Sequence, residues 1–460
     1  MPSMLRLGGA AAITLAQQSV IAAKPWRMRS GLGQDITVDL GQAIRRLAPA
    51  SEMRWETLNG YPADLPDRLI GAYFGCYPTR DGRHVIPANI YPTLKSAMLA
   101  ALDCADNPEA LGRAIAEHSA DELEALAERR GIVFAKVRTV EEFVTEPVFE
   151  HLAARPLIEI DKVADTPPEP LPEWGTHPLS GIRALGMGHV IAGAGIGRSL
   201  ASLGADVLNV WRVMEFEQDP LVATANVGVR STRLNVRGPA DQDTLRGLLR
   251  DADIFYANRR PGLLTELGVD ADQAFAVRPG LIHVTASCHG ETGPWAGRIG
   301  FDQVAGTVTG MVAAEGSLEQ PQLPPTSIIN DYLVAWLGAT GAMAALVRRA
   351  TEGGSYRVHV SLTARGHVGG HARLLRLGLR APGRRQRRRT RTARPAAVHL
   401  THPARPLPGV TENITLSRTP HHYLNVLSPR GSGCPARTRS TSRVWPHCSD
   451  ARAARHGPDL

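Results

Sequence analysis

Short apolar runs alternate with amphipathic segments through residues 179–362. Apolar runs of this length predict strands, and apolar residues at helical spacing predict helices. The predicted strands lie at 181–188, 206–211, 253–259 and 280–287, and the predicted helices at 196–205 and 241–252. Strands alternating with helices in this way predict the α/β class, with a parallel, doubly wound, Rossmann-like sheet.

Ligands on such sheets bind beyond the carboxyl ends of the strands, and that rule selects three short segments. They are residues 188–197 after the first strand, Trp211 and Arg212 after the second, and residues 258–262 after the third.

The flanking regions divide the chain further. Residues 1–165 have short β-like runs around a turn at Asp81-Gly82, then a predicted helix over 107–131 that ends on Gly131, and read as a smaller α+β region. The stretch 166–178 is rich in proline and predicts an extended linker. Residues 179–362 form the predicted Rossmann-like region, and 363–460 form a tail.

Two segments of the chain resemble each other. Residues 11–40 and 341–362 each contain a small-residue helix, a glycine turn and an alternating strand that ends in leucine. One interpretation is that the N-terminal region is the back part of a unit whose front part is 179–362. Chance likeness between two helix–turn–strand units is the alternative.

The tail carries the basic charge of the chain. From Ala364 onward the sequence has nineteen Arg, no Lys and three acids, a charge of +16, so the total of +8 leaves −8 for the remainder. The periodicity also stops here. A shifted reading frame in a GC-rich gene, a disordered basic tail and a nucleic-acid-binding arm all fit, in decreasing order of preference. We therefore expect an irregular tail and no nucleic-acid partner.

The five cysteines are scattered and match no metal or disulfide pattern, which favours a reducing, cytoplasmic environment and no metal site. No run of eighteen apolar residues predicts a membrane helix.

The segment 192–212 invites a dinucleotide-binding interpretation, but two requirements fail. Arg198 occupies the third glycine position of G-x-G-x-x-G, and Asn209, Trp211 and Arg212 stand where an acid would hold a ribose. A small-residue loop leading into a helix can still bind phosphate. Arg212 suits a phosphorylated ribose, although a solvated surface arginine is the alternative.

Two further segments carry candidate chemistry. Asn258, Arg259 and Arg260 follow the third strand and suit pyrophosphate. The segment 323–347 places Asp331 at the start of an almost wholly apolar helix. From residue types alone, Asp331 is either a helix cap or a reactive carboxylate in a dry pocket.

Taken in order, these elements resemble the class III (CaiB/BaiF) CoA-transferase family, which includes formyl-CoA and carnitine CoA-transferases and α-methylacyl-CoA racemases. The matching segments are "PLSGIRALGMGHVIAGAGIGRSLASLGADVLNV", "NVGVRSTRLNV", "ANRRPGLLTELGVD", "RPGLIHVTASCHGETGPWAGRIGFDQVAGTVTGMV" and "INDYLVAWLGATGAMAALVRRATEGGSYRVHVSL", and they cover most of 178–362. Residues 70–155 resemble the C-terminal region of the family. The resemblance therefore covers most of 1–362 in rearranged order.

The resemblance implies a function and a site. Asp331 matches the aspartate that attacks an acyl-CoA thioester and becomes an anhydride and then an aspartyl-CoA thioester. Substrates would be an acyl-CoA and a small carboxylic acid, with no permanently bound cofactor, in an interlocked homodimer. The implied coenzyme A contacts are His189, Val190, Ala192, Arg212, Arg230, Asn258 and Arg259.

Departures from the family pattern keep other functions open. Trp211 replaces a common acid, Ile191 replaces a polar residue near the nucleophile, and a later glycine-rich loop is not recognisable. A racemase needs a second acid/base group, usually a His before the Asp of "GFD", and here that residue is Phe301. A catalytically inactive CoA-binding scaffold and an NADP-dependent oxidoreductase are further alternatives.

Overall fold

The computed structural model covers the large sheet, the N-terminal region and short parts of the tail. It describes residues 3–47, 57–58, 61–62, 68–173, 175–260, 262–326, 328–364, 397–401, 406–410, 414–423, 430 and 432.

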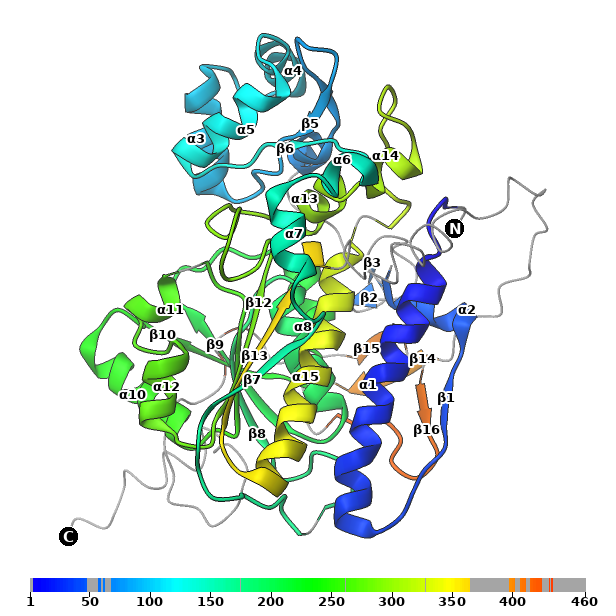
Figure 1. The fold of residues 1–460 in the computed structure, drawn as a ribbon, viewed down its shortest axis with the longest axis vertical. Coiled ribbons are helices and arrows are strands. Elements are labelled where there is room, and N and C mark those ends of the chain that lie inside the picture. Colours follow the sequence, from blue (N-terminus) through cyan, green and yellow to red (C-terminus); the bar gives the residue numbers. More distant parts are fainter. Residues whose placement is uncertain are drawn as a thin grey trace.

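A seven-stranded sheet organises the larger part of the molecule (Figure 1). Its strand order is β10-β9-β8-β11-β12-β13-β7, parallel throughout except for β7, which pairs antiparallel with β13. The strands are β8 (Arg183–Met187), β9 (Asp206–Arg212), β10 (Arg230–Leu234), β11 (Ile254–Ala257), β12 (Ile282–Ser287), β13 (Ser355–Ser361) and β7 (Glu159–Ala164). In chain order from β8 the parallel strands read 3-2-1-4-5-6, the Rossmann order, so the predicted large parallel sheet is confirmed.

Helices cover both faces of this sheet. On one face lie α8 (Ala192–Ser202), α15 (Asn330–Glu352) and, outside them, α1 (Leu7–Ser30); on the other lie α10 (Pro239–Arg250), α11 (Leu263–Glu266) and α12 (Ala271–Val277) (Figure 1). A Cβ on Gly195 of α8 would lie 2.8 Å from the Cβ of Ala335 on α15. The two helix backbones therefore approach closely, and this contact fixes the start of α15 against the start of α8.

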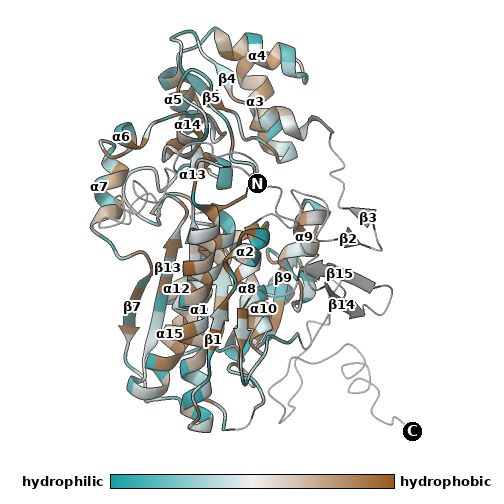
Figure 2. Ribbon diagram, turned by 90° about the vertical axis from the view of Figure 1, so that its right-hand side faces the viewer, coloured by the Kyte–Doolittle hydropathy of each residue, from teal (hydrophilic) through white to brown (hydrophobic). Residues whose placement is uncertain are grey.

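Residues 77–153 form a smaller unit above the sheet (Figure 1). Strands β4 (Tyr77–Pro78), β5 (His84–Ile86) and β6 (Ala135–Lys136) make an antiparallel sheet beside α3 (Pro92–Leu102), α4 (Pro108–Ala116), α5 (Ala120–Arg130), α6 (Val140–Phe143) and α7 (Pro147–Ala153). Its helices are amphipathic, with brown and teal residues side by side on α4 in Figure 2.

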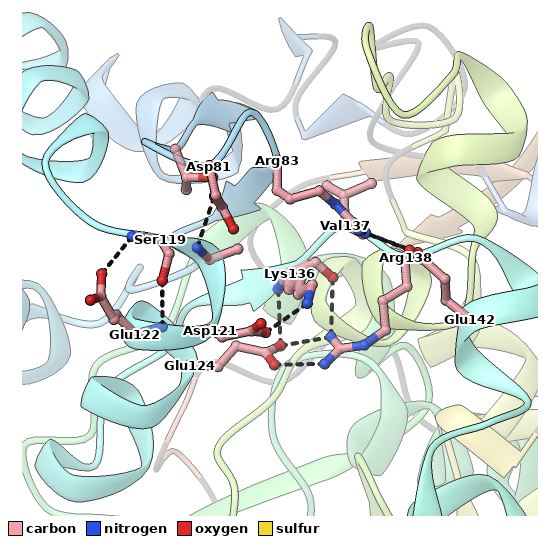
Figure 3. Close-up of polar contacts among 12 residues, drawn as sticks. Asp81, Arg83, Ser119, Asp121, Glu122, Glu124, Lys136, Val137, Arg138 and Glu142 are labelled. Atoms are coloured by element: carbon pink, nitrogen blue, oxygen red, sulfur yellow. Dashed lines mark hydrogen bonds and ion pairs between the residues drawn. The ribbon is translucent and has the colours of Figure 1, made fainter.

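The single helix predicted over 107–131 is two helices, and Ser119 explains the break. Its hydroxyl accepts a hydrogen bond from Glu122 N–H at 3.2 Å, while the Glu122 carboxylate accepts one from Ser119 N–H at 2.7 Å (Figure 3). This capping box starts α5 afresh. Gly131, at a φ of 62°, ends it as predicted.

The smaller unit is joined to the sheet layer through α13 (Asp302–Val308) and α14 (Met311–Glu315). Val304, Val308 and Val312 pack against apolar side chains of β5, β6 and the adjoining loops. The unit therefore rests on the helix that begins at Asp302.

Within the smaller unit, the buried Arg138 guanidinium donates two hydrogen bonds to the Glu124 carboxylate, at 2.7 and 2.8 Å (Figure 3).

Part of the tail departs from the expected irregular structure. Strand β16 (Ile414–Leu416) pairs antiparallel with β1 (Ile36–Val38), and both Ile414 and Leu416 are buried in the main core. Buried apolar side chains explain why this piece is ordered. Most of 363–460 lies outside the described residues, so the interpretations of its origin stay predictions.

The remaining elements are short. They are α2 (Leu40–Ala43), the 3-10 helices η1 (Ile44–Leu47) and η2 (Arg68–Phe74), α9 (Asp219–Ala225), the β2 (Thr57–Leu58)–β3 (Tyr61–Pro62) pair and the β14 (Ala397–Thr401)–β15 (Pro406–Val410) pair.

Tyr256, in the centre of β11, gives a stability prediction. Its hydroxyl is fully buried and has no hydrogen-bond partner among the described residues. Because an unsatisfied buried hydroxyl costs about 1–3 kcal/mol, Tyr256→Phe is expected to raise the free energy of unfolding by about 1 kcal/mol in urea titration. Tyr356→Phe is the matched control. The Tyr356 hydroxyl donates to the Gly353 carbonyl at 3.0 Å, and its loss should destabilise. A destabilised Tyr256→Phe protein would contradict the prediction.

Candidate active site

The strand order reverses between β8 and β11, and the loop after β8 is fixed by Asn258 at the end of β11. The Asn258 side-chain oxygen accepts from His189 N–H at 2.9 Å, and its amide nitrogen donates to the His189 carbonyl at 3.0 Å. A Cβ on Gly193 would lie 2.1 Å from that same oxygen, so only glycine fits there. Val190 is held at a φ of 53°, which strains a β-branched residue. The place where the strand order reverses is the switch point of the sheet, and ligands of such sheets bind there. The strained loop after β8 lies at this point and is therefore a candidate ligand site.

Asp331 lies in the first turn of α15 but does not cap that helix. The N-cap residue is Ile329, which makes no side-chain cap bond. The Asp331 carboxylate instead accepts a hydrogen bond from the backbone N–H of Ala192, the first residue of α8. Asp331 is therefore placed at the positive end of a neighbouring helix, where a carboxylate is stabilised.

A second carboxylate, Asp302, is held beside Asp331. It begins α13 and accepts from the backbone N–H groups of Ile329 at 2.9 Å and Asp331 at 2.6 Å. Both acids are buried, with 5% and 7% of their surface exposed. The pair therefore places two carboxyl groups together in a site with little water.

Burial and mutual repulsion set the electrostatics of this pair. Burial raises the pKa of Asp331 well above its usual range, the charge of Asp302 raises it further, and the Ala192 N–H opposes both. The neighbouring Cys288 thiol responds to the same surroundings: burial, then the charges of Asp331 and Asp302, raise its pKa. A carboxylate with a raised pKa in an apolar pocket is a stronger nucleophile than one in water.

The predicted coenzyme A contacts fall into three groups. His189, Val190, Ala192 and Asn258 lie together around the loop after β8. Arg212 and Arg259 lie at the ends of β9 and β11, where both contact the carboxylate of Glu215. Arg230 lies elsewhere.

The structure places Arg230 apart from the other predicted contacts. This residue begins β10, and parallel strands place that end at the edge of the sheet opposite the site. Its guanidinium forks onto Asp206, the first residue of β9, at 2.8 Å to each carboxylate oxygen. With side-chain exposures of 8% and 3%, the two form a buried ion pair. Arg230 holds the sheet together and does not face the candidate site.

Three site residues escaped the sequence analysis. Glu215 and Glu217 follow β9 directly, so the strand-end rule could have selected them. Tyr91 comes from the smaller unit: its hydroxyl lies 3.5 Å from His189 Nδ1, and its ring stacks on Phe301 at 5.8 Å. No local signal marks Tyr91, because the contact joins residues far apart in the sequence. A residue of the N-terminal region thus lies against the candidate site of the same chain.

Two other features bear on the chemistry of the described residues. None of their helices combines the length and apolar character that crossing a bilayer requires. Among the same residues, no cluster of three or more His, Cys, Asp or Glu side chains could hold a metal ion.

The chain belongs to the family described as CoA-transferase family III, whose profile matches residues 7–164 and 179–406. The suspected resemblance is confirmed. The gap between the two matched segments is the proline-rich stretch.

Individual relatives are similar over part of the chain. The acetyl-coenzyme A transferase nodX of Hypoxylon pulicicidum is 35% identical over 42% of this chain and 33% of its own length. A probable CoA-transferase of Mycobacterium tuberculosis is 29% identical over 43% of this chain and 28% of its own length. The succinyl-CoA–D-citramalate CoA-transferase of Chloroflexus aurantiacus is 31% identical over 40% of this chain and 49% of its own length. The chain thus spans between about a quarter and a half of these relatives.

A solved CaiB/BaiF family protein from Brucella suis aligns at 24% identity over 45% of this chain and 60% of that one, with a TM-score of 0.38. The family assignment rests on the sequence match.

Proposed function

We propose that this chain transfers coenzyme A from an acyl-CoA thioester to a carboxylic acid, with Asp331 as the nucleophile. The observation that carries the proposal is the placement of Asp331: buried beside Asp302, with Ala192 N–H donating to its carboxylate. Membership of CoA-transferase family III supports the reaction class. Several relatives, among them the succinyl-CoA–D-citramalate CoA-transferase, are named for succinyl-CoA.

The proposed reaction needs no redox step and no metal. An Asp331 oxygen attacks the thioester carbonyl, the carbon–sulfur bond breaks, and coenzyme A leaves as a thiolate, giving an acyl–aspartyl anhydride. The thiolate attacks the aspartyl carbonyl and releases the first carboxylate, giving an aspartyl-CoA thioester. The acceptor carboxylate then repeats both steps in reverse order, which restores the Asp331 carboxylate and yields the new acyl-CoA.

This chain's residues suit each stage. The N–H groups at the start of α8 can stabilise negative charge on the reacting carbonyl oxygens. Burial of Asp331 and Asp302 keeps water from hydrolysing the anhydride and the thioester. The strained loop at Val190 and the arginines Arg212 and Arg259 are the proposed contacts for the phosphate-bearing end of coenzyme A.

The experiment that tests the function is an exchange assay. Purified protein is incubated with a panel of short acyl-CoA thioesters and isotopically labelled carboxylic acids, and labelled acyl-CoA is measured by chromatography with mass detection. Label entering the acyl-CoA pool supports a transferase. Absence of exchange across the panel, with CoA still bound, would instead support the inactive scaffold.

The racemase alternative is disfavoured by Phe301 and by the state of His289. Phe301 has no exchangeable proton and stacks on Tyr91. Burial, then Arg298 and Arg138, lower the pKa of His289 to about 3, and its ring packs edge-on against Trp295 at 5.5 Å. Deuterium entering the α-carbon of an (R)-2-methylacyl-CoA in deuterated water would overturn this preference.

The paired carboxylates predict the pH dependence of the transfer rate. Only ionised Asp331 can attack, so kcat/KM should rise with pH along a limb whose midpoint lies above the ordinary range of aspartate, about 3.9. Asp302→Asn removes the repelling charge and should move that limb to lower pH. A wild-type limb near pH 4, or one that Asp302→Asn leaves in place, would count against Asp331 as the ionising group.

We also propose a homodimer, on the strength of the family resemblance. Sedimentation of the purified chain over a range of concentrations distinguishes a dimer from a monomer.

A further inference from the structure

The segment 213–218, which we name the strap, has an inverted distribution of side chains. It joins β9 to α9 at the switch-point edge of the sheet. Its apolar residues Val213, Met214 and Phe216 are 55%, 93% and 42% exposed. Its acids are buried, with side-chain exposures of 5% for Glu215 and 1% for Glu217. Burying carboxylates while exposing apolar groups is unfavourable unless the carboxylates have strong partners.

Glu215 has such partners in the two candidate phosphate-binding arginines. The Arg259 guanidinium forks onto it, with Nη2 at 3.3 Å from one oxygen and Nη1 in contact with the other. Arg212 donates to it from its backbone N–H at 3.0 Å and from Nη2 at 3.3 Å. Burial alone would raise the pKa of Glu215, but Arg259 outweighs it and the pKa falls to about 2. Glu215 is therefore an anion at any physiological pH.

Glu217 occupies the other half of the site. One of its oxygens accepts from the Val190 N–H at 3.3 Å, and the other lies 3.1 Å from His189 Nδ1 and 3.4 Å from the Tyr91 hydroxyl. The strap is also pinned by an edge contact of 5.9 Å between Phe216 and Tyr91. The two acids thus engage five of the residues that surround the switch point.

These donors would serve a phosphate as well as they serve a carboxylate. Arginine forks and backbone N–H groups bind both anions in the same geometry. Arg259 is held ready because its Nε also donates to the Met187 carbonyl at 2.7 Å. Arg212 keeps a buried Nε without a hydrogen-bond partner among the described residues, a donor that Glu215 does not use. A phosphate group, with more oxygens than a carboxylate, could accept from it.

We propose that the strap competes with the phosphate groups of coenzyme A for the same hydrogen-bond donors. In the free protein Glu215 and Glu217 occupy these donors, and CoA binds by displacing the two glutamates. This inference rests on the proposed CoA-transferase function, since it assumes that the phosphates of CoA bind to these donors. Met214, at a φ of 61° and almost fully exposed, lies where the strap leaves β9 and would move with it. The strap thereby sets how tightly the chain holds CoA.

Calorimetric titration with free CoA tests the proposal through Glu215→Gln. Gln keeps the size of the side chain but replaces charge-assisted bonds to Arg259 and Arg212 with weaker neutral ones. The variant is expected to bind CoA about tenfold more tightly than the wild type. Glu266→Gln is the matched control, because it removes the same charge from an exposed ion pair with Arg237 and should leave the affinity unchanged.

Hydrogen exchange of the wild type provides a readout that depends on no variant. Peptides covering 213–218 should exchange faster when CoA is added, because the strap is released. The competition proposal would be wrong if Glu215→Gln bound CoA no more tightly than the wild type, or if hydrogen exchange of the strap slowed when CoA was added. Neither result would contradict the proposed CoA-transferase function. If neither the wild type nor any variant binds CoA, the proposed function itself fails, and the strap with it.

Discussion

Replacing Asp331 by asparagine is expected to lower the rate of CoA transfer by roughly a thousandfold or more. The amide cannot attack a thioester to form an anhydride. Transfer by the wild type and by Asp331→Asn is compared in the exchange assay. Asp272→Asn, an exposed aspartate on α12, is the control and should retain full activity.

The same substitution should make the protein more stable at neutral pH. Because the pKa of Asp331 is raised in the folded state, the folded protein loses stability as pH rises from the unfolded pKa through the folded one. Asparagine removes this penalty, so its advantage should be present at neutral pH and vanish in acid. Thermal unfolding at several pH values measures it. An active Asp331→Asn protein, or one equally destabilised at every pH, would contradict the assignment.

Replacing Arg230 by methionine is expected to reduce the free energy of unfolding by about 3–5 kcal/mol and to leave CoA affinity unchanged. Methionine preserves much of the apolar volume but leaves the Asp206 carboxylate buried without the fork it now binds. Denaturant unfolding measures the loss, and Arg233→Met, on an exposed position of the same strand, should cost little.

A second substitution tests whether Arg230 acts through its ion pair with Asp206 or through the candidate CoA site. Adding Asp206→Leu to Arg230→Met should recover much of the lost stability, because replacing a buried ion pair by apolar groups often changes the free energy of unfolding little. If Arg230→Met were stable but bound CoA tenfold more weakly, Arg230 would belong to the site after all.

The parallel sheet could be predicted because its strands are nearly continuous apolar runs. The strand-end rule then placed His189, Asn258 and Arg212 correctly at one edge. Arg230 came from the family resemblance alone, and its place at the opposite edge could not be foreseen because β10, with polar residues at Ser231, Thr232 and Arg233, was not recognised as a strand.

Other features depend on tertiary contacts that no local pattern carries. Asp331 was identified as either a cap or a nucleophile, but its hydrogen bond to the N–H of Ala192 requires α8 and α15 to pack at Gly195. Tyr91 reaches His189 only because the smaller unit rests on α13. The break at Ser119, in contrast, was readable from its capping-box spacing to Glu122.

Mass analysis of the protein trapped during turnover tests the central claim most directly. Wild-type protein is mixed with an acyl-CoA substrate and hydroxylamine, digested, and its peptides are sequenced by mass spectrometry. We expect a hydroxamate on Asp331 that forms only when acyl-CoA is present and is absent from Asp331→Asn. Sustained exchange with an unmodified Asp331, or with a modification on Cys288 instead, would contradict the account.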